Sequence, residues 1–361
     1  MAQHFLLSPQ CRSMSILAIA GMTESAAYKK FRAILWADNG GAPICPECGN
    51  RDVWTIRADS RWKCSKKGCR TQFSVTSHTI FKDRKLSFRK ILTACALFAN
   101  GVLGVAACRL SRELDITYNS AWVLLHKVRE AMGNEAEAMR LGGIVEIDGA
   151  VFGGSLPRLP NAKELWASFK KKHGPAAKRR RKLVVVMRER DDLKSGVIGR
   201  VRTFLLSKEG DAIELARDVL LPDTIVHADM SPQWEPLHML FDTKRINHTE
   251  HFSHNGACTN MAESFFERMR CAERGVHKHI SGAHIHRYAM ELGWREQYRR
   301  TSNGEQFGML LAAVGRAEPS STMRGYWQGR KPKGKSVPPP TDEEEYNAIA
   351  VLTGRQGPPF P

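Results

Sequence analysis

Four of the nine cysteines form two pairs whose spacing is typical of a metal-binding ribbon. Each pair occupies a short turn that also contains a glycine, and fifteen residues separate the two turns. The four residues are Cys45, Cys48, Cys64 and Cys69. Four thiolates at such spacing match the tetrahedral coordination that Zn²⁺ prefers. Because protein sulfur atoms would fill all four positions, we expect one structural zinc ion, whose binding also drives the folding of this small segment.

Three acidic residues lie at positions from which they could form a second, oxygen-based metal site. Asp148 lies in a strand-like apolar run, where alternation places it on the same face as Glu146. Asp229 directly follows the apolar run that ends at Ala228, and Glu263 lies in the first turns of a predicted helix. The carboxyl ends of strands are where open α/β sheets place their sites, so we expect these acids to gather around one point.

Such a carboxylate cluster is suited to phosphoryl transfer. Two Mg²⁺ or Mn²⁺ ions about 3.5–4 Å apart can activate an attacking hydroxyl and stabilise the leaving oxygen. Arg270 lies seven residues after Glu263, on the same helix face, and could contact a phosphate.

The pattern around the acids predicts a mixed sheet with helices. The expected strands and helices are strands at 144–152, 183–188, 197–206, 224–228 and 245–248, and helices at 211–220, 260–271 and 281–300. An insertion near 156–182 separates the first two strands and is rich in lysine and arginine. Its charge density predicts a mobile loop. The candidate DNA-binding residues in it are Lys178, Arg179, Arg180 and Arg181.

Three helical patterns precede the sheet, at about 87–100, 103–114 and 117–132. Only Asp115, Ile116 and Thr117 separate the last two patterns, as in a helix-turn-helix whose second helix enters the major groove of DNA. An ordinary helical hairpin is the alternative on pattern alone. The outward side of the second helix is expected to present Asn119, Trp122, His126, Lys127 and Arg129, of which Asn119, Lys127 and Arg129 are the candidate DNA contacts.

Composition narrows the class of protein. Lysine and arginine total 55 against 37 acidic residues, and the resulting net charge of +18 favours a polyanionic partner such as nucleic acid. No apolar run reaches the roughly 18 residues of a membrane-spanning helix, and no signal peptide is recognised. An odd number of cysteines without an export signal favours reduced thiols. We expect a cytoplasmic, nucleoid-associated protein.

The order of these motifs resembles bacterial insertion-sequence transposases of the ISXO-two-like type. The resemblance spans about residues 25 to 300 and is carried by Cys45 to Gly49, Cys64 to Cys69, Val145-Glu146-Ile147-Asp148, Thr259-Asn260 with Glu263, and His279-Ile280-Ser281. It implies an α/β fold: an RNase H-like mixed sheet flanked by helices, preceded by a zinc ribbon and a helix-turn-helix. It also implies that Asp148, Asp229 and Glu263 are catalytic metal ligands. Some relatives have an asparagine in the third position, and Asn260 lies one turn before Glu263, so either residue could complete the site. We prefer Glu263, because a carboxylate binds a metal ion better than an amide does. The family usually has an acidic residue directly after the first aspartate, where this chain has Gly149.

The resulting hypothesis is a DDE-type DNA transposase that binds terminal inverted repeats and cleaves and joins strands with two Mg²⁺ or Mn²⁺ ions. Its expected parts are a leader with a short helix at 1–38, a zinc ribbon at 39–82, a DNA-binding helix-turn-helix at 83–137, a catalytic domain at 138–300 and a mostly disordered extension at 301–361. We expect a homodimer or higher oligomer on double-stranded DNA, with no membrane partner. A non-catalytic DNA-binding regulator is the main alternative, and a host nuclease on the same fold is a third.

Overall fold

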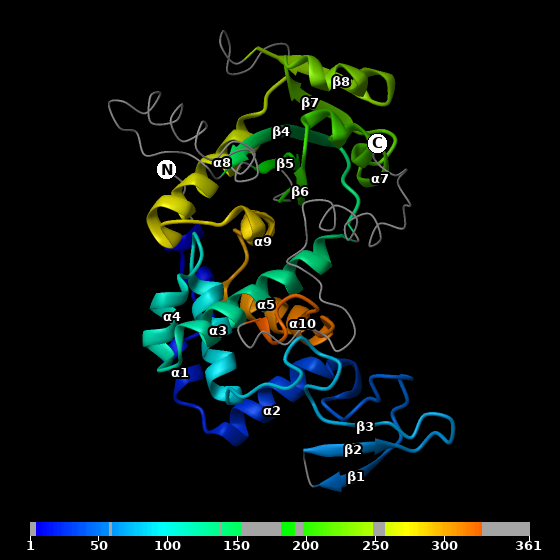
Figure 1. Cartoon of the computed structure of the whole chain (residues 1–361), viewed down its shortest axis with the longest axis vertical. Helices are drawn as coiled ribbons and strands as arrows, with labels where there is room; N and C mark the ends of the chain where they lie inside the picture. The colour runs from blue at the N-terminus through cyan, green and yellow to red at the C-terminus, as the bar shows by residue number, and fades with distance from the viewer. Residues whose placement is uncertain are drawn as a thin grey trace, which may run out of the picture. The chain divides into compact units, whose positions relative to one another are not determined.

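The computed structural model describes residues 5–57, 60–137, 139–152, 182–191, 198–247 and 257–326 (Figure 1). The candidate DNA-binding residues Lys178, Arg179, Arg180 and Arg181 lie outside this set, as does most of the predicted C-terminal extension. Residues Met1–Ser320 belong to one compact unit, which is the part described below. Within the described residues, no helix has the length and apolar character needed to cross a membrane.

A small antiparallel sheet follows two N-terminal helices. The helices are α1 (Ile16–Ala20) and α2 (Glu24–Leu35), and the strands are β1 (Val53–Arg57), β2 (Arg61–Cys64) and β3 (Gln72–Phe73), in the order β1-β2-β3. Trp62 and Phe73 on the strands meet Trp36, the residue that ends α2, with ring centroids 5.3 and 6.5 Å from that of Trp36. This aromatic contact joins the small sheet to the helices.

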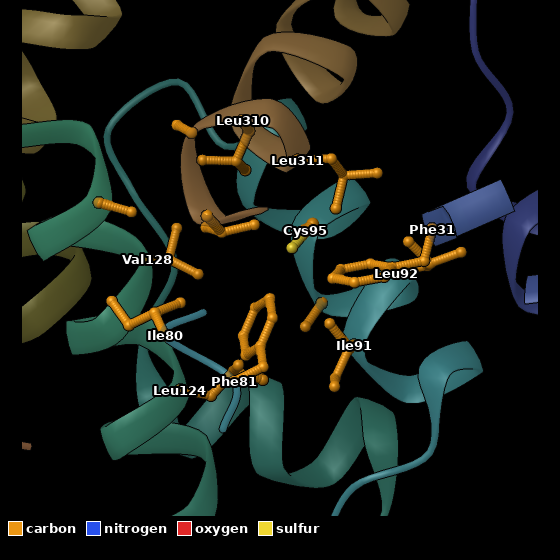
Figure 2. Close-up of a cluster of buried hydrophobic side chains, with 14 of the residues drawn as sticks. Phe31, Ile80, Phe81, Ile91, Leu92, Cys95, Leu124, Val128, Leu310 and Leu311 are labelled. Atoms are coloured by element: carbon orange, nitrogen blue, oxygen red, sulfur yellow. The ribbon is translucent and has the colours of Figure 1, made fainter. Parts of the chain in front are cut away.

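The helices α1 and α2 share a hydrophobic core with four later helices. These are α3 (Phe88–Asn100), α4 (Ala107–Leu114), α5 (Tyr118–Glu137) and α10 (Asn303–Arg316). Figure 2 shows side chains from α2, α3, α5 and α10 converging on Phe81. Leu310 and Leu311 of α10 are buried in this core, although α10 falls within the segment expected to be mostly disordered and was not among the predicted helices. A capping box formed by Ser302 and Glu305 starts α10.

A five-stranded mixed sheet forms the second half of the unit. Its strands are β4 (Ile144–Phe152), β5 (Lys182–Glu189), β6 (Val201–Leu206), β7 (Ile225–Asp229) and β8 (Asp242–Ile246). The spatial order is β6-β5-β4-β7-β8. The pairs β4·β5 and β5·β6 are antiparallel, whereas β4·β7 and β7·β8 are parallel. All five predicted strands are present, but β6 begins four residues later and β8 three residues earlier than expected.

Helices cover both faces of this sheet. The helix α7 (Ala212–Val219) packs on one face, where Val145 and Ile147 of β4 are buried. The helices α8 (Asn260–Cys271) and α9 (Ile285–Gln297) pack on the other face, where Ala150 and Phe152 are buried. Side chains alternate along a strand, so the even-numbered positions of β4 face α8 and α9. The sheet is therefore the middle layer of three, and the face that carries α8 also receives the even-numbered acids of β4.

Candidate active site

Asp148 and Asp229 occupy matching positions on neighbouring parallel strands. The parallel register of β4 and β7 pairs Glu146 with His227, and Asp148 and Asp229 each follow two residues later. Both aspartates therefore lie beyond the last paired residues of these two strands, and we call this place the acidic edge. The backbone N–H of Gly149 donates to Asp148 Oδ1 at 2.7 Å. The N–H of Ser231 donates to Asp229 Oδ1 at 2.9 Å, so each carboxylate is held by a local backbone group.

The Asp148 carboxyl lies in a partly buried and negatively charged environment. Burial, followed by the charges of Asp229, Glu209 and Glu263, raises the pKa of Asp148 to about 7. The three acids that the sequence analysis selected are therefore close enough to interact, although they come from β4, β7 and α8. A fourth acid, Glu209, belongs to the same electrostatic cluster.

A buried carboxylate connects α8 to the sheet. Glu146 is 0% exposed, and its Oε2 accepts hydrogen bonds from the backbone N–H groups of Met261 at 2.8 Å and Ala262 at 3.0 Å. These groups belong to the first turn of α8, where N–H groups have no partner within the helix and carry partial positive charge. Glu146 therefore fixes the start of α8, the helix that carries Glu263, against the strand that carries Asp148.

The other two residues expected near this site also lie on α8. Asn260 is the first residue of the helix and is exposed. Arg270 is exposed in the last turn, with Nη1 3.8 Å from Glu267 Oε2 and its guanidinium 5.8 Å from the ring of Phe152 on β4. Glu263, in the same turn as Asn260, is also exposed, so the choice of Glu263 over Asn260 stays a prediction. Arg270 thus remains on the outer surface of α8, beside β4.

Sequence reasoning did not single out Glu209. It lies in the short 3-10 helix η4 (Glu209–Asp211), directly before α7. Acidic residues are common at such positions because they interact favourably with the helix dipole. One sequence signal was Gly149, because a strand interior rarely favours glycine unless another group approaches closely. A Cβ at Gly149 would lie 3.0 Å from both Cγ and Oε1 of Glu209. Because Gly149 has no side chain, the side chain of Glu209 can pack against the backbone of β4 at this position.

The donor set at this edge fits a hard divalent cation. Within the described residues, Asp148, Asp229 and Glu209 form no ion pair with a lysine or arginine. Clustered carboxylates without a cation repel one another, and oxygen atoms are the ligands that Mg²⁺ and Mn²⁺ prefer. Among the described residues, however, only the cysteine quartet has ligand atoms that all lie within 4.8 Å of one another. We therefore expect the acidic side chains to move closer together when they bind an ion.

The four predicted cysteines form a compact sulfur cluster on the small sheet. Cys45 Sγ lies 3.6 Å from Cys69 Sγ, and Cys48 Sγ lies 3.6 Å from Cys64 Sγ. Sulfur atoms placed tetrahedrally at about 2.3 Å from zinc would be about 3.8 Å apart, so the cluster has nearly the size of a zinc site. Hydrogen bonds from Thr71 lower the pKa of Cys69 to about 6, which favours the thiolate that metal binding requires. The cluster supports one structural zinc ion.

The helices α4 and α5 have the predicted three-residue connection. The left-handed conformation of Asp115, with φ of 49°, ends α4, and α5 begins at Tyr118. Asn119 is exposed and Lys127 is half-buried, so both remain on the outer part of α5. This arrangement is compatible with the expected DNA-binding pair.

The prediction that Arg129 and His126 face outward is wrong. The helix α9 packs along that side of α5, and Arg129 is 1% exposed while His126 is 0% exposed. Arg129 Nε donates to Glu291 Oε2 of α9 at 2.6 Å. A buried guanidinium is tolerated when a carboxylate pairs with it, so Arg129 joins two helices instead of contacting DNA.

Comparison with known families agrees with this arrangement. Residues 140–297 match the family described as the ISXO2-like transposase domain, and residues 22–72 match the transposase zinc-ribbon domain. The first match includes all four clustered acids, the second includes all four clustered cysteines, and together they cover more than half of the chain. No curated protein and no solved structure matched the chain. With both domains present in this order, the chain belongs to the ISXO2-like transposases.

Proposed function

We propose that this protein is a metal-dependent DNA transposase that cleaves and joins strands at the ends of an insertion sequence. Asp148, Asp229 and Glu263 are the proposed ligands of two Mg²⁺ or Mn²⁺ ions. The observation that carries the proposal is the electrostatic convergence of these acids, from three different elements, inside the region that matches the transposase domain. Structural ion-pair networks can also shift pKa values, but Asp148 and Asp229 have no cationic partner among the described residues.

The topology of the sheet supports an RNase H-like interpretation of the fold. Three antiparallel strands, β4 to β6, are extended on the other side of β4 by the parallel strands β7 and β8, with helices on both faces. In this arrangement Asp148 lies on the central strand and Asp229 at the carboxyl end of its parallel neighbour. That edge is where open α/β sheets place their ligands.

The chain's own residues prepare the site for a DNA backbone. Bound divalent ions would activate the attacking water or 3′ hydroxyl and stabilise the charge that develops on the phosphate. Asp148 must lose a proton before it can act as a ligand, because burial and its acidic neighbours raise its pKa to about 7. Glu146 holds the N-terminus of α8 against β4, which supports the proposed approach of Glu263 to the two aspartates. Arg270, exposed near Phe152, is available to contact a phosphate of the substrate.

DNA recognition is assigned to the zinc ribbon and to the pair α4 and α5, acting as a helix-turn-helix. Asn119 and Lys127 are the proposed contacts from α5, and the basic segment containing Lys178 to Arg181 adds positive charge. Because two element ends must be processed together, we propose that at least two copies assemble on DNA. The expected location is the cytoplasm, in association with the nucleoid.

Replacement of one carboxylate tests the proposal most directly. The purified protein is incubated with DNA that carries the element ends, in Mg²⁺ or Mn²⁺. Asp148→Ala or Asp229→Ala should reduce strand cleavage below detection while binding of the terminal DNA stays nearly unchanged. Asp223→Asn is the matched control, because Asp223 is exposed before the opposite end of β7.

The results separate the proposed enzyme from its alternatives. Cleavage that survives both alanine substitutions would refute the assignment of the site. Tight binding without any cleavage by the wild-type protein would favour the non-catalytic regulator. Cleavage that does not depend on the terminal repeats would favour a nuclease on the same fold.

A further inference from the structure

The small sheet of the zinc ribbon packs on the helices with one of its two faces. Trp62 and Phe73 are paired across β2 and β3, and both are buried against the aromatic ring that ends α2. Paired residues of neighbouring strands project to the same side of a sheet, whereas successive residues of one strand project to opposite sides. The side away from the helices therefore carries the row that is paired across the three strands as Trp54, Lys63 and Gln72.

Large apolar side chains of β1 remain exposed to solvent. Trp54 is 49% exposed, and Ile56, at the irregular end of the strand, is 50% exposed. The strand β1 is also an edge of the sheet. Exposed apolar side chains on an edge strand promote unwanted pairing between chains, and an apolar patch with a polar rim typically marks a binding surface. This face of the ribbon is therefore suited to an interaction.

Cations surround the exposed tryptophan. The guanidinium of Arg70 lies 4.8 Å from the ring centroid of Trp54, so a cation–π contact positions both groups. Arg57 and Arg61 are paired at the hairpin end of β1 and β2, and alternation along β2 puts Arg61 on the same side as Lys63. Within the described residues, none of these cations forms an ion pair with a carboxylate. Their charge is therefore available to a polyanion.

The spacing of the cations fits the major groove of a DNA duplex. Arg57 and Arg61 lie at one end of the sheet, and Arg70 lies at the other end, just before the strand whose Gln72 pairs with Lys63. Antiparallel strands rise about 3.4 Å per residue, so the two ends of the four-residue β2 are about 10 Å apart. The major groove is about 12 Å wide and admits β-strands. Cations at the two ends can thus meet the phosphates on both sides of the groove, while the middle of the row meets base edges.

We propose that this outer face of the ribbon binds duplex DNA of the element ends in its major groove. Lys63 and Gln72 contact base edges, and Trp54 supplies the apolar contact between them and the backbone. The phosphate contacts are Arg57, Arg61 and Arg70. This inference rests on the proposed function, since it takes the DNA partner from there, and it adds which face of the ribbon binds and what each residue contributes.

The test measures the affinity of the full-length, zinc-loaded protein for a duplex that carries an element end, by fluorescence anisotropy at several salt concentrations. Trp54→Ala should raise the dissociation constant about 10-fold or more with nearly unchanged salt dependence, because it removes contact area but no charge. Arg57→Gln should reduce the slope of log affinity against log salt by about 1, because it removes one phosphate contact. The matched controls are Leu17→Ala, at an exposed apolar residue of α1, and Arg217→Gln, at an exposed cation of α7. Both should bind like the wild type.

A scrambled duplex separates base contacts from phosphate contacts. Gln72→Ala should lower the preference for element-end DNA over the scrambled duplex by about 5-fold or more, because the amide can pair with a base edge. Arg57→Gln should weaken binding of both duplexes alike, since phosphates carry no sequence information. Equal losses on both duplexes for Gln72→Ala would overturn the proposed base contact.

Zinc analysis and hydrogen exchange of residues 45–73 distinguish a lost contact from a lost fold. A Trp54→Ala protein that keeps its zinc and binds the duplex like the wild type would overturn the proposal. So would weaker binding of the same sequence as a single strand only, or a changed oligomeric mass with unchanged DNA affinity, which would assign the face to a second copy. If Trp54→Ala loses its zinc, the exposed Arg57→Gln still decides through the salt slope, and an unchanged slope would refute the phosphate contact.

Cleavage separates this inference from the proposed function. At saturating DNA, Trp54→Ala should cleave at the wild-type single-turnover rate, because the acids at the catalytic edge are unchanged. If the wild type cleaves element ends and the outer-face variants bind them normally, this inference fails and the proposed function stands. If the wild type neither prefers nor cleaves element-end DNA, both fail.

Discussion

The sulfur cluster and the acidic edge are assembled in opposite ways. The four cysteines lie within residues 45–69, on two turns joined by one small sheet, and their sulfur atoms are already arranged for zinc, with separations of 3.6 Å. The acids extend from Asp148 to Glu263 and lie on β4, η4, β7 and α8. The first site depends on local chain geometry, whereas the second depends on the packing of the whole sheet.

The two sites also differ in whether they leave coordination positions open to water or substrate. Four thiolates complete the coordination of a zinc ion, so that site has no position for water or substrate. The acidic edge has oxygen donors on both faces of the sheet and no cationic partner for Asp148, Asp229 or Glu209 among the described residues. A closed site is suited to stabilising the fold, and an open one is suited to chemistry.

Loss of zinc should give the largest effect and should remain local. In Cys64→Ser, amide hydrogen exchange in residues 45–73 should rise nearly to the rate of an unfolded segment, because metal binding supplies most of the folding free energy of such a segment. Exchange in β4, β5 and β7 should stay near the wild-type rate. Hydrogen-exchange mass spectrometry with zinc analysis measures both, and Cys108→Ser, at an exposed cysteine outside the cluster, is the control.

An equal rise in exchange throughout the large sheet would contradict the comparison, since it would show that the two regions fold as one unit. Unchanged exchange in residues 45–73 of a zinc-free variant would contradict the structural role of the metal.

Removal of the Glu146 carboxylate should disturb the acidic edge from a distance. Glu146→Ala leaves the first turn of α8 without its acceptor, so we expect a loss of about 2–4 kcal/mol in the free energy of unfolding and at least about 100-fold slower cleavage. Glu146→Gln keeps an acceptor oxygen and should recover part of the rate. The measurements are chemical denaturation and single-turnover cleavage at a temperature where all variants are folded.

A control on the opposite face of the sheet separates positioning from general stability. Glu189 also accepts backbone hydrogen bonds, from Gly142 at 2.7 Å and Arg200 at 2.8 Å, but it pairs with Val145 and its odd-numbered position on β5 faces α7. Glu189→Gln should lower stability without slowing cleavage. Equal slowing by Glu189→Gln and Glu146→Gln would mean that cleavage follows stability alone.

Patterns within short windows account for what the sequence could predict. The cysteine turns, the strands of the large sheet and the position of Asp229 at a strand end follow from periodicities of a few residues, and the structure agrees with them. Glu263 required the order of several motifs. Its convergence with Asp148 was expected from the sheet and now has support from their electrostatic interaction.

Contacts between residues far apart in the sequence account for the features that the sequence analysis did not predict. The outward placement of Arg129 failed because α9, more than 150 residues later, covers that side of α5 and supplies Glu291. The helix α10 was not predicted, although its residues precede the tail rich in glycine, proline and charge and its buried side chains pack on α2, α3 and α5. Glu209 and Glu146 look like ordinary helix and strand residues until their partners, Gly149 and the start of α8, are known.

The smallest predicted effect is the loss in free energy of unfolding that Asp148 causes when no metal ion is bound. Burial and the neighbouring acids raise the pKa of Asp148 from 3.8 to about 7, so the metal-free folded state binds more protons than the unfolded state between these values. The free energy of unfolding therefore falls as pH rises through this window and stays low above it. Asp148→Asn removes the penalty, and we expect a gain of about 1–2 kcal/mol at pH 8, or about 2–4 °C in Tm.

Melting curves of the zinc-loaded protein from pH 4 to pH 8, with and without Mg²⁺, measure this penalty. The advantage of Asp148→Asn should grow up to about pH 7 in Mg²⁺-free buffer. Added Mg²⁺ should reduce it, because only the wild type regains stability by binding the ion. A pH-independent difference between the two proteins would mean that Asp148 is ionised without strain, and the acidic edge would then resemble the sulfur cluster in needing no ion to relieve repulsion.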